Sequence, residues 1–224
     1  AAAECREVVV SVFVNPTQFQ ETRDLDAYPR DLETDAQLAG EAGADLIFAP
    51  SEITMYPENF ETWVELTRTT QGMEGAARPD HFRGVATVCL KLFNMLAPSS
   101  AYFGWKDVQQ TTVIAKMIDD LNLPLELRLG LTIRDADGLA LSSRNSRLSL
   151  NERASAALLP RALEAGVAAH HSGASATEAA TAILASDTQI EPEYVEEMSA
   201  HGHRVLCGAV RVGEVRLIDN MILE

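Results

Sequence analysis

Two hydroxyls, a guanidinium and an amide occupy four consecutive positions of LALSSRNSRL, the segment that covers residues 139–148. Ser and Asn side chains readily hydrogen-bond the nearby backbone, so one interpretation is a solvated turn that caps the next helix. The other interpretation is an anion site, because hydroxyls position phosphate oxygens and Arg144 would supply a planar, permanently charged fork. The segment alone leaves both interpretations open.

Amide and charged side chains also follow two apolar segments that we expect to be parallel strands. VNPTQF supplies Asn15 and Gln18 after the first, and FGWKDVQQ supplies Lys106, Asp107 and Gln110 after the other. Open α/β sheets bind ligands beyond the carboxyl ends of their strands, so this placement favours a ligand site over separate solvated loops. Lys106, beyond the carboxyl end of a predicted strand, could bind a phosphate group.

A second concentration of positive charge lies in RPDHFRGV, residues 78–85, directly before a predicted helix. A single loop histidine is usually structural, which is one interpretation of His81. Together, however, Arg78, His81 and Arg83 at a helix N-terminus would form an anion-binding surface.

The apolar pattern predicts strands that alternate with helices, as in a mostly parallel sheet. VVVSVFV at 8–14 is continuously apolar and β-branched, which is typical of a central strand covered on both faces. LELRLGLTI at 125–133 alternates at period two and predicts a half-exposed strand. The other expected elements are strands at 44–50 and 101–104, helices at 31–42 and 85–96, and a helix that Asp107 caps and that continues to Leu121.

Beyond the Asp137–Gly138 turn the pattern changes, so we predict one domain over 1–132 and a smaller α+β domain over 133–224. Two S-x-x-E capping boxes, led by Ser149 and Ser175, predict helix starts, and Pro160 should kink the first of these helices. Gly213 and Glu214 separate two apolar runs and predict a tight hairpin turn.

Composition limits the classes of partner. No apolar run approaches the roughly 20 residues that a membrane helix needs, so we expect no membrane segment. A net charge of −15 opposes broad attraction to nucleic acid or to an anionic membrane. Any anionic ligand must therefore be held by local positive groups.

Cysteine and histidine spacing indicates neither disulfides nor a metal site. Cys5, Cys89 and Cys207 are widely separated and lack CxxC spacing, which favours reduced cysteines in a core. His201 and His203 in HGH have no Cys, Asp or Glu partner at ligand spacing, so we expect no metal ion there. The N-terminus shows no secretion signal, and the cytoplasm is the expected location.

Eight motifs, taken in chain order, resemble those of the pantothenate synthetase family, the pantoate–β-alanine ligases. This resemblance implies an α/β fold: a Rossmann-like nucleotidyltransferase domain with a mostly parallel sheet, followed by a smaller α+β lid domain. It also implies a cytoplasmic homodimer that binds small molecules only. The motifs are VNPTQF, DLDAYPR, FAPS, MYP, RPDHFRGV, YFGWKDVQQ, GLALSSRN and RLIDN.

The resemblance further implies a reaction and its site. Pantoate and MgATP would form a pantoyl adenylate and pyrophosphate, and β-alanine would then displace AMP to give pantothenate. Mg²⁺ would be carried by the ATP phosphates. The pantoate and β-alanine residues would be Asn15, Gln18, His81 and Gln110; the ATP residues would be Gly104, Trp105, Lys106, Asp107, Ile133, Leu141, Ser142, Ser143 and Arg144, of which Lys106, Ser142, Ser143 and Arg144 would be catalytic.

One family segment does not occur in the sequence. The resemblance places a PTMGxLHxGH segment, whose two histidines act on the ATP phosphates, before the first residue here, and the 224 residues contain no HxGH. This leaves open a truncated or remnant form that only binds pantoate or nucleotide. A nucleotidyltransferase for another carboxylate or phosphate is also open, although the pair Gln18 and Gln110 favours a small hydroxy acid.

Overall fold

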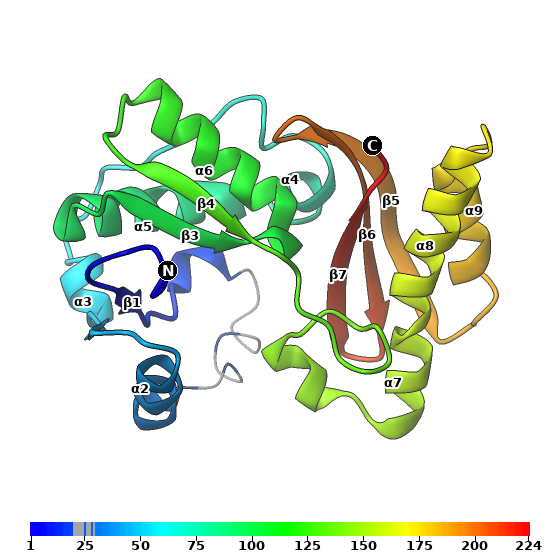
Figure 1. The fold of residues 1–224 in the computed structure, drawn as a ribbon, viewed down its shortest axis with the longest axis horizontal. Helices are drawn as coiled ribbons and strands as arrows, with labels where there is room; N and C mark the ends of the chain where they lie inside the picture. The colour runs from blue at the N-terminus through cyan, green and yellow to red at the C-terminus, as the bar shows by residue number, and fades with distance from the viewer. Residues whose placement is uncertain (20–24, 26–27, 29) are drawn as a thin grey trace. The chain divides into compact units, whose positions relative to one another are not determined.

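The computed structural model describes residues 1–19, 25, 28 and 30–224, so most of the DLDAYPR motif lies outside the described residues. The chain divides into two compact units, coloured by residue number in Figure 1. Unit 1 comprises Ala1–Tyr102 and Val113–Arg128, and unit 2 comprises Phe103–Thr112 and Leu129–Glu224. A short segment from the middle of the chain thus groups with the C-terminal residues. The domain boundary near Ile133 stays a prediction.

The first part of the chain has the predicted mixture of helices and strands. Parallel strands β1 and β2 pair with Val10 opposite Ile47. The long helix α5 presents an apolar stripe to the core and buries Phe82, Val85 and Phe93. The elements are β1 (Val9–Ser11), η1 (Pro16–Gln18), α2 (Leu32–Glu41), β2 (Leu46–Phe48), α3 (Glu52–Met55), α4 (Met73–Ala77), α5 (His81–Leu96), β3 (Ser100–Gly104), η2 (Trp105–Asp107), α6 (Val108–Asp120) and β4 (Glu126–Gly130).

Three details of these elements differ from the predictions. β1 is shorter than 8–14, and Val9 is 37% exposed, because among the described residues β2 alone pairs with it. β4 ends at Gly130, so the apolar side chain of Ile133 lies beyond the strand and is 65% exposed. Asp107 ends the short 3₁₀ helix η2, which runs directly into α6, so the helical segment begins at Trp105 and the capping role of Asp107 stays a prediction.

Unit 2 packs two helices on one face of an antiparallel sheet in the order β5-β6-β7 (Figure 1). Leu159 and Leu163 of α8 meet Leu206 and Val210 of β6 in its core, and all four are fully buried. Removing this apolar surface from water is the main term that stabilises the unit. Its further elements are η3 (Ser143–Arg147), α7 (Leu150–Ala156), α8 (Leu158–His171), α9 (Ala176–Leu184), β5 (Ile190–Ala200), β6 (His203–Val212) and β7 (Val215–Ile222).

Capping and turn signals in unit 2 are largely confirmed. Ser149 forms a complete capping box at the start of α7, and the Ser175 hydroxyl accepts from the backbone at the start of α9. The kink predicted at Pro160 is a break at Ala157 instead, because proline is tolerated in the first turn of a new helix. Gly213 has a φ of +55° in the β6–β7 turn, where a side chain would be strained.

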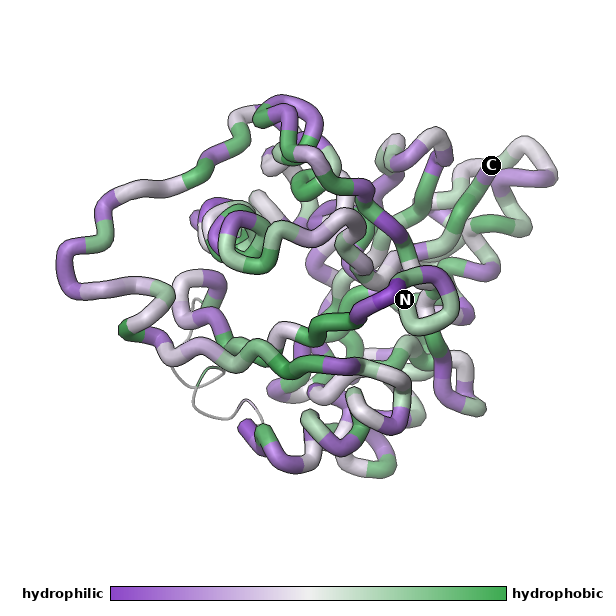
Figure 2. The backbone as a smooth tube through the Cα atoms, turned by 60° about the vertical axis from the view of Figure 1, so that its left-hand side comes forward, coloured by the Kyte–Doolittle hydropathy of each residue, from purple (hydrophilic) through white to green (hydrophobic). Residues whose placement is uncertain are grey.

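Hydrophobic and hydrophilic residues alternate over short distances along the backbone (Figure 2). Such patterning suits elements that bury one face and expose the other. Among the helices of the described residues, none is both long and apolar enough to cross a membrane.

Candidate functional site

In unit 1, Asn15 is the central residue of a buried amide cluster. Asn15 is 3% exposed and caps η1, where its Oδ1 accepts from the Thr17 hydroxyl at 2.9 Å. Its Nδ2 donates to Gly84 O and to Gln18 Oε1, both at 3.2 Å. One side chain thus ties η1 to α5 and fixes the orientation of the Gln18 amide.

His81 begins α5 and faces the same short helix. Its Nδ1 lies 3.0 Å from the backbone oxygen of Gln18, and Arg78 donates to that oxygen at 2.9 Å. A carbonyl oxygen only accepts, so the Nδ1 of His81 carries the proton and its Nε2 is unprotonated in the neutral ring. The geometry therefore gives His81 a direct role in holding Gln18.

Close backbone approach explains why glycine stands at position 84. A Cβ built on Gly84 would lie 2.6 Å from Thr17 O, closer than real Cβ atoms come to backbone. The fourth residue of α5 must therefore lack a side chain for η1 to reach the helix. Neither the sequence spacing nor the charge pattern of RPDHFRGV indicates this contact.

Unit 1 also has a small polar cavity of about 110 Å³ beside the amide cluster. Arg83 lies at its wall, 3.6 Å from Asp80 and with its guanidinium 5.0 Å above the Trp63 ring. Neither Asn15 nor Gln18 lines this cavity, so it is separate from the predicted substrate amides. Its lining residues are Glu65, Leu66, Thr70, Gly75, Arg78, Asp80, Phe82 and Arg83.

In unit 2 the structure joins two of the predicted nucleotide loops. Lys106 lies two positions after Gly104. Its Nζ donates to Leu141 O at 3.4 Å, although Lys106 and Leu141 are 35 positions apart. Leu141 N in turn donates to Ile133 O at 2.9 Å. Three of the predicted ATP residues, Lys106, Leu141 and Ile133, therefore belong to one continuous group of contacts.

The ammonium group of Lys106 lies in a crowded, partly cationic setting. Burial lowers its pKa most, and the charges of Arg144 and Arg134 lower it further. Asp107 and Asp219 oppose that shift. In a chain with a net charge of −15, this group of three cations and two carboxylates is a local exception that suits an anion.

The serine–arginine segment forms the 3₁₀ helix η3. The Ser142 hydroxyl accepts from Arg144 N at 3.2 Å, so the capping interpretation is correct for Ser142. The Ser146 hydroxyl donates to Ser143 O at 2.8 Å, and the buried Asn145 donates to Ala140 O at 3.0 Å. These bonds make the amide of the motif structural and define the backbone that carries Ser143 and Arg144.

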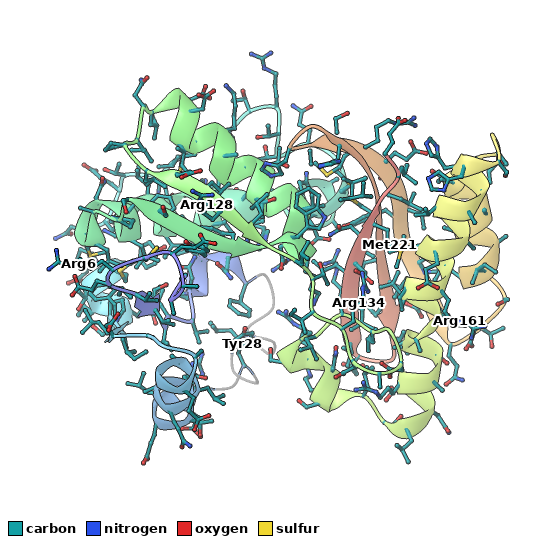
Figure 3. The ribbon with its side chains drawn as sticks, in the orientation of Figure 1. Arg6, Tyr28, Arg128, Arg134, Arg161 and Met221 are labelled. Atoms are coloured by element: carbon teal, nitrogen blue, oxygen red, sulfur yellow. The ribbon has the colours of Figure 1, made fainter. Side chains whose placement is uncertain are left out.

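Asp219 and Asn220 of RLIDN had no predicted role in the site. They support residues 104–107, which we call the lysine loop. Arg134, labelled in Figure 3, binds Asp219 of β7 with both terminal nitrogens, at 2.6 and 3.0 Å. Asn220 donates to Trp105 O at 3.0 Å and to Lys106 O at 2.8 Å. Asp219 and Asn220 are each 3% exposed. Two consecutive polar residues in an otherwise apolar strand are the sequence feature that indicates Asp219 and Asn220.

His201 and Gly202 of the HGH segment form the turn between β5 and β6, His203 begins β6, and both histidines pack against Trp105. The Trp105 ring centroid lies 5.6 Å from that of His201 and 6.1 Å from that of His203. His201 Nε2 lies 2.9 Å from the Thr111 hydroxyl, and burial lowers the pKa of His201. The part of the chain that the structure describes contains no group of three or more His, Cys, Asp or Glu residues that could hold a metal ion.

The predicted residues for pantoate and β-alanine fall in both units. Asn15, Gln18 and His81 come together in unit 1, whereas Gln110 lies in the first turn of α6, in the segment that belongs to unit 2. Each unit therefore presents its own part of the predicted set, and the roles of all four residues stay predictions.

Comparison with known proteins identifies the family of the chain. A family model described as pantoate-beta-alanine ligase matches residues 1–222. The chain is 46% identical to the pantothenate synthetase of Chloroflexus aggregans, with 100% of this chain and 86% of the relative covered. It is 45% identical to the pantothenate synthetase of Pelotomaculum thermopropionicum, of which 84% is covered by the whole of this chain.

Solved structures give the same result at the level of the fold. The pantothenate synthetase of Thermus thermophilus matches with a TM-score of 0.94 and 42% identity, covering 99% of this chain and 85% of that one. The pantoate-beta-alanine ligase of Francisella tularensis, solved with beta-gamma ATP and beta-alanine, matches with a TM-score of 0.84 and 31% identity, covering 99% and 81%.

These matches and the α/β architecture define an ATP-binding ligase with a Rossmann-like fold. The chain belongs to the pantoate–β-alanine ligase family, whose members are pantothenate synthetases.

Proposed function

We propose that this protein condenses pantoate with β-alanine in a reaction driven by ATP. A carboxylate oxygen of pantoate attacks the α-phosphorus, the bond from that phosphorus to the bridging oxygen breaks, and pyrophosphate leaves. The amine of β-alanine then attacks the acyl carbon of the pantoyl adenylate, loses a proton and releases AMP as the amide forms. Family membership supports this proposal, as does the Francisella tularensis relative solved with beta-gamma ATP and beta-alanine.

The contact between Lys106 and Leu141 carries the assignment of the ATP site. It joins the loop that contains Gly104, Trp105 and Asp107 to the segment that contains Ser142, Ser143 and Arg144. Adenylyl transfer needs little covalent help from the protein, because positioning and charge stabilisation dominate. Lys106 and Arg144 would stabilise the negative charge that develops on the phosphates, and the two serine hydroxyls would donate to phosphate oxygens. Ile133 and Leu141 would contact the nucleotide through their exposed apolar side chains.

The amide cluster of unit 1 suits the organic substrates. An amide donates and accepts at once, so Gln18 would hold the hydroxyls or the carboxylate of pantoate, and the resemblance assigns the same role to Gln110 of unit 2. Asn15 and His81 would act by keeping Gln18 in place, as their hydrogen bonds to it indicate.

Mg²⁺ would be bound to the ATP phosphates and would neutralise part of their negative charge. Lys106 lies among two guanidinium groups and two carboxylates, and its own ammonium and Arg144 are the groups that fit phosphate oxygens rather than a metal ion. The family resemblance assigns further phosphate contacts to an HxGH segment that these 224 residues do not contain. We therefore propose that Lys106, Ser142, Ser143 and Arg144 make only part of the phosphate contacts.

The resemblance alone supports three broader proposals. The protein would act as a homodimer, in the cytoplasm, with residues 1–132 as a nucleotide- and pantoate-binding domain and residues 133–224 as a smaller α+β lid domain. Light scattering after size-exclusion chromatography tests the dimer, and a mass near 24.3 kDa would contradict it.

Isotope exchange tests the central proposal. Labelled pyrophosphate should enter ATP only when pantoate is present, because the first step is reversible and needs that carboxylate. Pantothenate and AMP should appear only after β-alanine is added. The variant Lys106→Met keeps the length of the side chain but removes its charge, and it should slow exchange by about 10²–10³ if the ammonium acts like an oxyanion-hole donor. Exchange that needs no pantoate, or that prefers another carboxylate, would contradict the proposed substrate.

A further inference from the structure

One buried amide holds two consecutive peptide groups of the lysine loop. Asn220 lies in β7, is 3% exposed, and donates through Nδ2 to Trp105 O at 3.0 Å and to Lys106 O at 2.8 Å. Its Oδ1 has no partner among the described residues. Burying an unpaired oxygen costs free energy, so the two donated bonds are the favourable part of this placement.

Asn220 is itself placed by a partly buried ion pair. Its backbone N–H donates to Asp219 Oδ1 at 2.8 Å, and the same carboxylate accepts two bonds from Arg134. Arg134 also donates to Gly138 O at 3.0 Å, which ties the pair to the turn before the serine–arginine segment. A bidentate guanidinium–carboxylate pair fixes direction as well as distance. Asn220 therefore approaches η2 from a rigid support.

The Trp105 side chain makes ring contacts of its own. The Trp105 ring packs against His201 and His203, so packing can hold the ring without fixing the peptide groups of η2. Each of the two carbonyls that flank the Lys106 amide group accepts a hydrogen bond from Asn220. A side chain of β7 therefore constrains the direction in which Lys106 leaves the backbone.

We propose that Asn220 is a positioning residue for ATP, acting through the backbone of Trp105 and Lys106. Its amide keeps the Lys106 ammonium beside Leu141 and the Arg144 charge. The inference rests on the proposed ATP site at 104–107. A purely structural asparagine would affect stability alone, whereas a positioning asparagine affects the use of ATP and leaves pantoate binding unchanged.

The variant Asn220→Leu tests this role, because leucine is of similar size and cannot donate a hydrogen bond. Its kcat/KM for ATP should fall about 10- to 100-fold, the loss that a displacement of about 1 Å produces at a reacting group. The dissociation constant for pantoate should stay at the wild-type value. Leu163→Ala is the control: it removes core packing of unit 2 without touching η2, so it should lower the melting temperature and leave the KM for ATP unchanged.

Asn220→Asp extends the test if the leucine variant does not fold. A carboxylate cannot donate to the two carbonyls, but a protonated carboxyl group can donate one bond. Relative to wild type at the same pH, its affinity for ATP should be weak at neutral pH and should recover on acidification. An affinity ratio that does not depend on pH would overturn the positioning role.

Hydrogen exchange separates this inference from the proposed function. The backbone amides of residues 105–108 should exchange faster in either Asn220 variant than in Leu163→Ala. If wild type shows no pantoate-dependent exchange of pyrophosphate but these amides still speed up, the proposed function fails and the structural clamp stands. If wild type is active and Asn220→Leu shows wild-type kinetics for ATP, the positioning role is wrong.

Discussion

Lys106 and Arg144 show how single residues acquire a function from their surroundings. In isolation each is an ordinary cation in an acidic chain. The structure joins the Lys106 ammonium to Leu141 O, and the charge of Arg144 contributes to the lowered pKa of Lys106. Two like charges are held close together only when other interactions offset their repulsion, and an anionic ligand would relieve it. This is the residue-level reason to expect phosphate here.

Arg144→Ala should weaken binding of ATP far more than binding of AMP, which lacks the outer phosphates. A hydrogen bond to a charged group contributes about 1.5–3 kcal/mol, so the dissociation constant for ATP should rise about 10- to 150-fold. Arg144→Lys should restore part of the loss, because it keeps the charge without the planar fork. Calorimetric titration with both nucleotides measures the difference. An equal shift for ATP and AMP would rule out contact with the outer phosphates.

Gln18→Ala should weaken pantoate binding and leave ATP binding unchanged. The Gln18 amide is held by Asn15 in unit 1, whereas the nucleotide residues belong to unit 2. Losing one neutral hydrogen bond costs about 0.5–1.5 kcal/mol, which corresponds to a rise of about 2- to 13-fold in the dissociation constant for pantoate. Titrations with each ligand provide the test, and equal losses for both would indicate a folding defect instead.

At the scale of elements, amphipathic helices and the C-terminal hairpin were predictable because their signals are local. The 3.6-residue stripe of α5, the Ser149 capping box and the Gly213 turn each depend on neighbours in sequence. The strand β5 at Ile190–Ala200 was not predicted, because glutamates and a proline dilute its β-branched residues. The strand forms through pairing with β6, which local pattern does not report.

Gly84→Ala tests the contact between two elements, η1 and α5. The added Cβ would lie 2.6 Å from Thr17 O, so one element must move, at a cost of about 1–3 kcal/mol. Thermal unfolding should show a lower midpoint, and pantoate binding should weaken because Asn15 bonds Gly84 O. Gly40→Ala in α2 is the matched control: nothing lies within 4 Å of its Cβ, and it should be neutral or stabilising. Similar behaviour of the two variants would contradict the close approach.

At the scale of the whole molecule, each unit buries one cysteine. Cys89 lies in the core of unit 1, where burial raises the pKa of its thiol to about 12, and Cys207 is 4% exposed in unit 2. Cys5 is only half-buried. Each buried thiol therefore reports on the integrity of its own unit.

A thiol reagent at about pH 8 should modify Cys5 rapidly in the folded protein and the other two cysteines only on unfolding, because a protonated, buried thiol is unreactive. Mass spectrometry of intact and digested protein counts and locates the labels. Cys5→Ser should remove the fast label without changing the slow ones. Rapid native labelling of Cys89 or Cys207 would show that the corresponding core is not packed as described.

The sequence by itself determined the order of most helices and strands, several caps and turns, the family, and the loops that bear polar side chains. These properties depend on neighbours along the chain or on motifs in a fixed order. Tertiary structure decided which loops meet: Lys106 with Leu141, and Asn220 with the Trp105–Lys106 backbone. It also decided that residues 103–112 group with the C-terminal unit. Such contacts join residues 35 or more positions apart and depend on packing and strand pairing, whose geometry no local pattern contains.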